Sequence, residues 1–188
     1  PRLQGAAAAT QVDPDRLIAT ATTPRRLPLS AIQTFTEMFG GSLRAPMPTS
    51  LALSVDAVTI GGSVLQSVGT DLRSDGEGWQ FDKLDFRAPG FTQVSASGRL
   101  GPAAKDPAKG LEFAGAVSVD ANDPKMLVAW LTGQPAATAH IKPWQLRGEV
   151  TLAADRIAVE RLKTDFDRRP LEGRVAYVWP VGDRPARL

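Results

Sequence analysis

Residues 79–86 read Trp79-Gln80-Phe81-Asp82-Lys83-Leu84-Asp85-Phe86, and this stretch decides the fold. Apolar residues alternate at positions 79 and 81, the alternation skips a step at Asp82-Lys83, and it resumes at 84 and 86. The same pattern recurs from Ile157 to Phe166, with its skip at Glu160-Arg161. Alternation with a period of two predicts a β-strand, and a skipped step predicts a β-bulge. We therefore expect one type of bulged strand to occur twice.

Each bulged strand leads through a short turn into a second strand. The turns are Ala88-Pro89-Gly90 and Asp167-Arg168-Arg169-Pro170, and the strands that follow contain Ser97-Gly98-Arg99-Leu100 and Glu172-Gly173-Arg174-Val175. The simplest interpretation is a duplicated hairpin. Repeated β units with one apolar face stack into an extended sheet, which is more typical of a scaffold or conduit than of an enzyme.

Most of the remaining sequence alternates in the same way, with tight turns such as Gly61-Gly62 between the strands. We therefore expect a mainly β protein, built as a curved antiparallel meander sheet from repeated hairpins. Glycines within strands, at 98, 115, 148 and 173, favour bulges or strong bending. The alternative is a closed β-sandwich, in which two sheets bury their apolar faces against each other.

Two short helices accompany the predicted strands. Apolar spacing predicts one from Leu29 to Phe39, and Asp123-Pro124 predicts the start of another, from 123 to 131, because aspartate can cap a helix and proline suits its first turn. Leu127, Trp130 and Leu131 would dock this second helix on the sheet. We expect an irregular or helical lead-in over 1–49 and a repetitive β domain over 50–188.

Composition excludes several classes of protein and site. The 22 Lys and Arg residues exceed the 20 Asp and Glu residues only slightly and are scattered, so we expect no nucleic-acid partner. The absence of cysteine removes disulfides and thiolate metal sites. No apolar run is long enough to cross a bilayer. Because the sequence begins at Pro1, we expect a piece of a longer protein whose anchoring or export segment is missing.

Few residues could carry catalysis. His140 stands alone, so it cannot complete a typical zinc site, and we interpret it as a loop residue. The carboxylates Asp82, Asp85, Asp165 and Asp167 alternate with basic residues, as on a solvated strand, although two of them could in principle act as a glycosidase pair. Core packing is the favoured role for the four tryptophans. We expect no catalytic residues, no metal and no cofactor.

Four segments together are typical of one known family. They are Leu-Ser-Val-Asp-Ala-Val-Thr-Ile-Gly-Gly (53–62), Gly-Trp-Gln-Phe-Asp-Lys-Leu-Asp-Phe-Arg-Ala-Pro-Gly (78–90), Val-Ser-Ala-Ser-Gly-Arg-Leu (94–100), and Phe113-Ala114-Gly115 followed by the 123–131 helix. With these segments the chain resembles the AsmA family of bacterial envelope proteins. The resemblance implies a periplasmic β domain of a protein anchored in the inner membrane by a helix absent from this chain. It also implies a role in phospholipid transport between membranes and in outer-membrane integrity.

The predicted function follows from the apolar strand positions. An acyl chain needs a surface without charges or unpaired polar groups. We expect that surface from the following lipid-groove candidates: Leu53, Val55, Leu72, Trp79, Phe81, Leu84, Phe86, Val94, Leu100, Phe113, Val117, Leu146, Val150, Leu152, Ile157, Val159, Leu162, Phe166, Val175 and Tyr177. The expected partners are phospholipid acyl chains and, through the parent protein, the inner membrane. The alternatives are a structural or interaction sandwich without lipid, and a carbohydrate-active enzyme or glycan-binding module.

Overall fold

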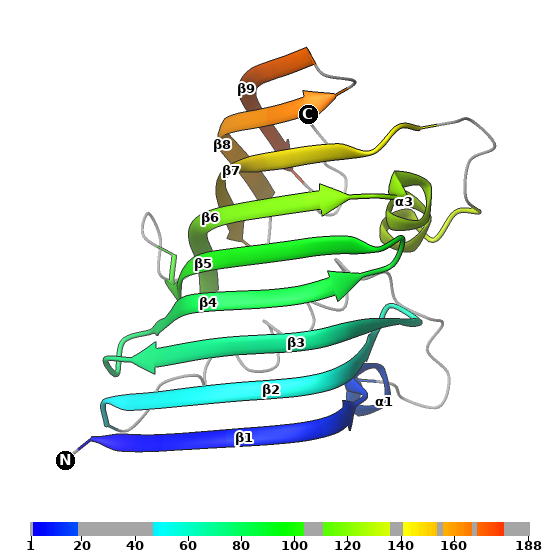
Figure 1. Ribbon diagram of the computed structural model, residues 1–188. Helices are drawn as coiled ribbons and strands as arrows, with labels where there is room; N and C mark the ends of the chain where they lie inside the picture. Colours follow the sequence, from blue (N-terminus) through cyan, green and yellow to red (C-terminus); the bar gives the residue numbers. More distant parts are fainter. Residues whose placement is uncertain are drawn as a thin grey trace, which may run out of the picture.

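The computed structural model describes residues 2–18, 47–103, 111–135, 141–153, 156–166 and 169–178. They form one nine-stranded sheet in which the strands lie side by side in sequence order, as Figure 1 shows. The strands are β1 (Leu3–Val12), β2 (Thr49–Ile60), β3 (Ser63–Ser74), β4 (Trp79–Ala88), β5 (Thr92–Pro102), β6 (Leu111–Ala121), β7 (Trp144–Ala153), β8 (Arg156–Phe166) and β9 (Arg169–Val178). Within these residues, two short helices, α1 (Pro14–Ile18) and α3 (Pro124–Thr132), accompany the sheet. The predicted mainly β meander is confirmed, and the described residues form no second sheet that would make a sandwich.

The lead-in segment differs from the expectation of an irregular or helical stretch. Residues 3–12, which contain the alanine run, form β1, and β1 pairs with β2 in parallel rather than antiparallel orientation. Alanine has little strand preference of its own, so this pairing depends on the neighbouring strand. The Asp15 carboxylate of α1 accepts hydrogen bonds from the backbone N–H groups of Gly61 (3.0 Å) and Gly62 (2.8 Å), which ties the end of β1 to the β2–β3 turn. The helix predicted over 29–39 lies outside the described residues.

Both predicted bulges are present. The register between β4 and β5 shifts between Phe81 and Leu84, and the register between β8 and β9 shifts between Val159 and Leu162. In each case two consecutive charged residues, Asp82-Lys83 or Glu160-Arg161, occupy the irregular step. The duplicated hairpin therefore exists in three dimensions as well as in sequence.

The sheet bends along a crease in the middle of its strands. On β5 and β6, Gly98 pairs directly with Gly115, and a methyl group added to either one would overlap the backbone of the other strand. Gly148 and the two bulges lie at the same level on neighbouring strands. Glycines, which have no side chain, and bulges both allow a strand to bend sharply. Figure 1 shows the strands from β4 to β8 turning at this level.

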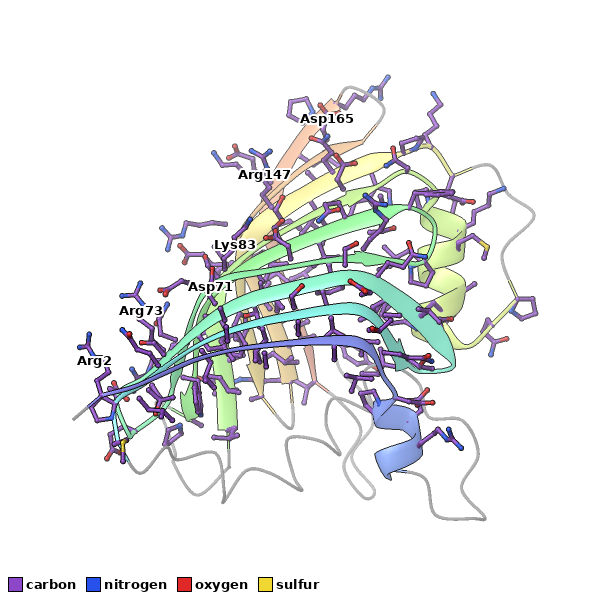
Figure 2. All side chains as sticks on the ribbon, turned by 60° about the horizontal axis from the view of Figure 1, so that its bottom comes forward. Arg2, Asp71, Arg73, Lys83, Arg147 and Asp165 are labelled. Atoms are coloured by element: carbon purple, nitrogen blue, oxygen red, sulfur yellow. The ribbon has the colours of Figure 1, made fainter. Side chains whose placement is uncertain are left out.

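The two faces of the bent sheet differ in chemistry. Figure 2 shows Asp71, Lys83, Arg147 and Asp165 on the outer side of the bend, with their side chains pointing outward. Because side chains alternate along a strand, their neighbours Leu72 and Leu146 point to the inner side. We call these two surfaces the outer face and the inner face.

Helix α3 covers one end of the inner face. Its Leu127 is 6% exposed and packs in a buried cluster with Leu65, Ala88 and Ala121, around which lie Phe86, Val94, Val119, Trp130, Leu131 and Trp144. The indole Nε1–H of Trp130 donates a hydrogen bond to the carbonyl of Ile60 at 3.1 Å. Asp123 is at the N-cap, as expected, but its side chain makes no capping hydrogen bond; Pro124 opens the helix and Gly133 ends it in the left-handed conformation.

Candidate functional site

The inner face brings most of the predicted groove residues into two rows that cross the strands. One row joins Trp79, Leu100, Phe113, Leu152, Ile157 and Tyr177 through direct cross-strand pairs from β4 to β9. The second row joins Leu72, Phe81, Gly98, Gly115, Val150, Val159 and Val175 from β3 to β9. We call these two rows the apolar track. None of its residues carries a charge.

The other groove candidates lie on the same face beside the track. Phe86 and Val94 pack against the buried cluster at α3, and Leu146 pairs with Val119 beside them. Leu84 and Val117 lie at the crease, Leu162 pairs with Gly173, and Leu53 and Val55 lie on β2. Phe166 pairs with Trp144 through its backbone, and its side chain is outside the described residues. The register thus gathers on one face the candidates whose side chains are described.

Burial divides the inner face into a closed part and a partly open part. Beneath α3, Ala121 is 0% exposed, whereas the residues of the track are half-buried except Val175 on β9, which is 45% exposed. The rings of Phe81 and Phe113 meet edge to face, with centroids 6.1 Å apart. They lie beside Gly98 and Gly115, where no side chain competes for the space.

Among the described residues, one polar side-chain atom of the inner face is buried without a hydrogen-bond partner. The hydroxyl Oγ1 of Thr70 is buried between the Leu53 and Leu84 pairing positions and has no hydrogen-bond partner. A buried hydroxyl without a partner is costly. It lies on β3, outside the residues of the track.

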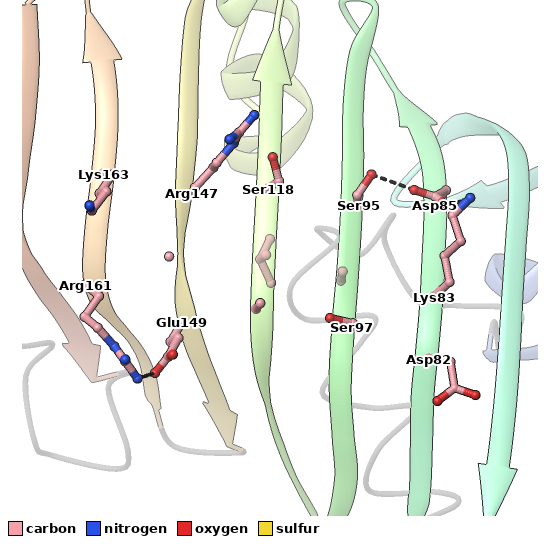
Figure 3. Close-up of a pocket in the computed structure, with 14 residues that line it drawn as sticks. Asp82, Lys83, Asp85, Ser95, Ser97, Ser118, Arg147, Glu149, Arg161 and Lys163 are labelled. Carbon is pink, nitrogen blue, oxygen red and sulfur yellow. Dashed lines mark hydrogen bonds and ion pairs between the residues drawn. The ribbon is translucent and has the colours of Figure 1, made fainter.

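The outer face carries a hollow of about 560 Å³ over β4 to β8. Figure 3 shows the side chains around it. Asp82, Lys83 and Asp85 come from one side, and Arg147, Glu149, Arg161 and Lys163 come from the other. Between them the floor is made of the outer-face residues Ser95, Ser97, Ala116 and Ser118, together with the strand segments at Ala96, Val117 and Gly148. A second hollow of about 480 Å³ lies over β1 to β4.

Most charged side chains of the first hollow form ion pairs with one another or with neighbouring residues. Lys83 pairs with Asp85 at 2.9 Å, and Arg161 pairs with Glu149. The Ser95 hydroxyl donates to Asp85 at 2.6 Å, and together with the Lys83 ammonium it lowers the pKa of Asp85. A glycosidase general acid has a raised pKa instead, so Asp85 is unsuited to that role.

The remaining chemical candidates give no cluster. His140, Asp167 and Trp179 lie outside the described residues. In the part of the chain that the structure describes, no group of three or more His, Asp or Glu side chains could hold a metal ion. Within the same residues, no helix is long and apolar enough to span a bilayer.

The residues of the outer hollow were not predicted as a site. Sequence reasoning treats Arg147 and its neighbours as a solvated strand face, because alternation alone does not tell which polar positions meet across strands. A usable signal is the run of small residues at the outer positions of β5 and β6, between two charged bulges. A comparison of the chain with protein-family models, curated proteins and solved structures finds no significant match.

Proposed function

We propose that this chain is an AsmA-like β domain that holds phospholipid acyl chains on the inner face of its sheet and has no catalytic role. The observation that carries the proposal is the apolar track, an uncharged and half-buried surface that continues across the strands. In the parent protein, the domain would lie in the periplasm, anchored to the inner membrane, and would serve phospholipid transport and outer-membrane integrity. The family resemblance supports this location.

The size of the track suits an acyl chain. The row from Trp79 to Tyr177 crosses β4 to β9, and five strand spacings of about 4.8 Å give a length of about 24 Å. An acyl chain in one leaflet spans about 15 Å, half of the hydrocarbon thickness of a bilayer. One chain can therefore lie along the row with its headgroup in water.

The chemistry of the track favours binding without selectivity. Each buried methylene contributes roughly 0.8 kcal/mol, so ten methylenes supply about 8 kcal/mol before the cost of ordering the lipid. The track offers no charge that would bind a headgroup, and its only polar side-chain groups are the indole N–H of Trp79 and the hydroxyl of Tyr177. The proposal thus describes a carrier or conduit for bulk lipid.

The test is to purify the chain from bacterial cells and to measure co-purified phospholipid by native mass spectrometry. Val150→Asp places a charge on the track, and Thr151→Asp places the same charge on the outer face one residue later. We expect Val150→Asp to lose most of the bound phospholipid and Thr151→Asp to retain it, with both variants giving a β circular-dichroism spectrum.

A second pair of variants protects the test against misfolding. Val175 is 45% exposed, so Val175→Asp costs little folding stability while still charging the track; Ala176→Asp is its outer-face control. A wild-type chain without phospholipid, or equal loading of the inner-face and outer-face variants, would refute the proposed function.

A further inference from the structure

The twin bulges build the outer hollow. A regular strand places every second side chain on one face, but a bulge can place two consecutive side chains there. The bulge of β4 contributes Asp82 and Lys83 to one wall, and the bulge of β8 contributes Arg161 to the other. Four strand spacings separate β4 from β8, which gives walls about 19 Å apart. The motif repeated in the sequence therefore shapes this site.

The floor between the walls allows a ligand to approach the sheet. Ser95, Ser97, Ala116 and Ser118 present only hydroxyl or methyl groups at the outer positions of β5 and β6. The Ser95 hydroxyl is engaged with Asp85, whereas the Ser118 hydroxyl has no partner among the described residues. The Ser97 hydroxyl likewise has no partner among the described residues, so a polar group that enters the hollow would find two available hydroxyls at its base, of which that of Ser118 lies beside Arg147.

Among the described residues, the charges around the hollow leave one cation, that of Arg147, without an ion-pair partner. Lys83 is paired with Asp85, Arg161 with Glu149, and Lys163 with Glu172 at 3.5 Å. Arg147 has no hydrogen-bond or ion-pair partner within the described part of the chain.

Arg147 also has a like charge beside it. Its cross-strand neighbours are Ser118 on β6 and Lys163 on β8, and Figure 3 shows the guanidinium reaching toward Ser118. Like charges directly opposite each other across two strands destabilise a sheet, and an anion between them relieves that repulsion.

We propose that the outer hollow is a binding site for a phosphate or carboxylate group. The Arg147 guanidinium is the principal ligand, the Ser118 hydroxyl donates from the floor, and Lys163 supplies the second positive charge. A guanidinium presents paired N–H donors that match two oxygens of such an anion. This site does not depend on the proposed lipid function, because it lies on the opposite face of the sheet.

The test is a titration of the ¹⁵N-labelled full chain with inorganic phosphate at constant ionic strength, followed by NMR. We expect saturable shifts of the Arg147 Nε–H signal and of backbone amides around Ser118. Arg147→Gln should weaken binding by at least about tenfold, since it removes a charge-assisted contact. Arg87→Gln is the matched control. Arg87, on β4, is likewise an exposed outer-face arginine without a described partner, but it lies outside the hollow.

A second probe identifies the source of the anion. Vesicles of phosphatidylglycerol and vesicles of phosphatidylcholine are compared with the wild type and with Arg147→Gln. Arg147-dependent binding of phosphatidylglycerol vesicles assigns the site to a lipid headgroup, and Arg147-dependent binding of dissolved phosphate alone assigns it to a soluble anion. The proposal is overturned if Arg147→Gln binds both probes like the wild type, or if Arg87→Gln loses as much affinity, which would indicate charge screening only.

Discussion

At the scale of single residues, the facing glycines of β5 and β6 set how closely the central strands approach. Gly98 and Gly115 lie opposite each other, and an added Cβ at Gly115 would overlap the Ser97 carbonyl oxygen. A backbone oxygen cannot move aside as the end of a flexible side chain can. Gly173 on β9 differs, because an added Cβ there would meet nothing within 4 Å.

We therefore expect Gly115→Ala to lower the free energy of unfolding and Gly173→Ala to leave it unchanged or slightly raised. Overpacking costs about 1–3 kcal/mol, whereas alanine in open space at a compatible conformation gains about 0.4–1 kcal/mol by restricting the unfolded chain. Urea unfolding followed by circular dichroism measures both. Equal stabilities of the two variants would contradict the close approach at the crease.

At the scale of elements, α3 stabilises one end of a sheet that has no second layer elsewhere among the described residues. The backbone N–H of Asp123 donates to the Gly90 carbonyl at 2.9 Å, which joins the helix start to the β4–β5 turn. Leu127 fills the buried cluster, and Trp130 reaches the β2–β3 hairpin. One helix thus links strands that are distant in the sequence.

Truncation of the helix should reveal this role. We expect Leu127→Ala to lower the free energy of unfolding by about 2–5 kcal/mol, because a 6% exposed leucine leaves a cavity when shortened. Val128→Ala, at a position that is 44% exposed on the same helix, should change it by no more than about 0.5 kcal/mol. Thermal or urea denaturation of the two variants provides the comparison, and similar losses would show that α3 is not docked as described.

At the scale of the whole molecule, the described chain is a bent single-layer sheet with a polar outside and an apolar inside. Strand order follows sequence order, so β5 and β6 lie in the interior of the sheet while β1 and β9 form its edges. An edge strand is held from one side only, and β1 and β9 are mostly exposed. Local stability should consequently fall from the centre toward both edges.

Hydrogen exchange measured by mass spectrometry tests this gradient. Among hydrogen-bonded amides, we expect those of β5 and β6 to exchange most slowly and those of β1 and β9 to exchange fastest. The α3 end of the central strands should be the best protected, because the buried cluster lies there. Uniform protection across all strands, including β1, would contradict a single open-edged layer.

Much of the architecture follows from local sequence patterns. The period-two alternation, the Gly61-Gly62 turn and the skipped steps at Asp82-Lys83 and Glu160-Arg161 all predict strands, turns and bulges that the structure contains. These features depend on neighbouring residues, so a single sequence suffices to find them. The helix at 124–132 was predictable for the same reason, through its proline start and apolar spacing.

Strand pairing between residues far apart in the sequence determined the features of the fold that local patterns did not predict. Nothing in the alanine run of β1 specifies a parallel partner, since that partner, β2, lies more than thirty residues away along the chain. The sequence by itself determined which side chains share a face of each strand. Only the tertiary structure decided the inner side of the bend, the rows of the apolar track, and the meeting of Ser118, Arg147 and Lys163, because strand register and curvature are properties of the assembled sheet.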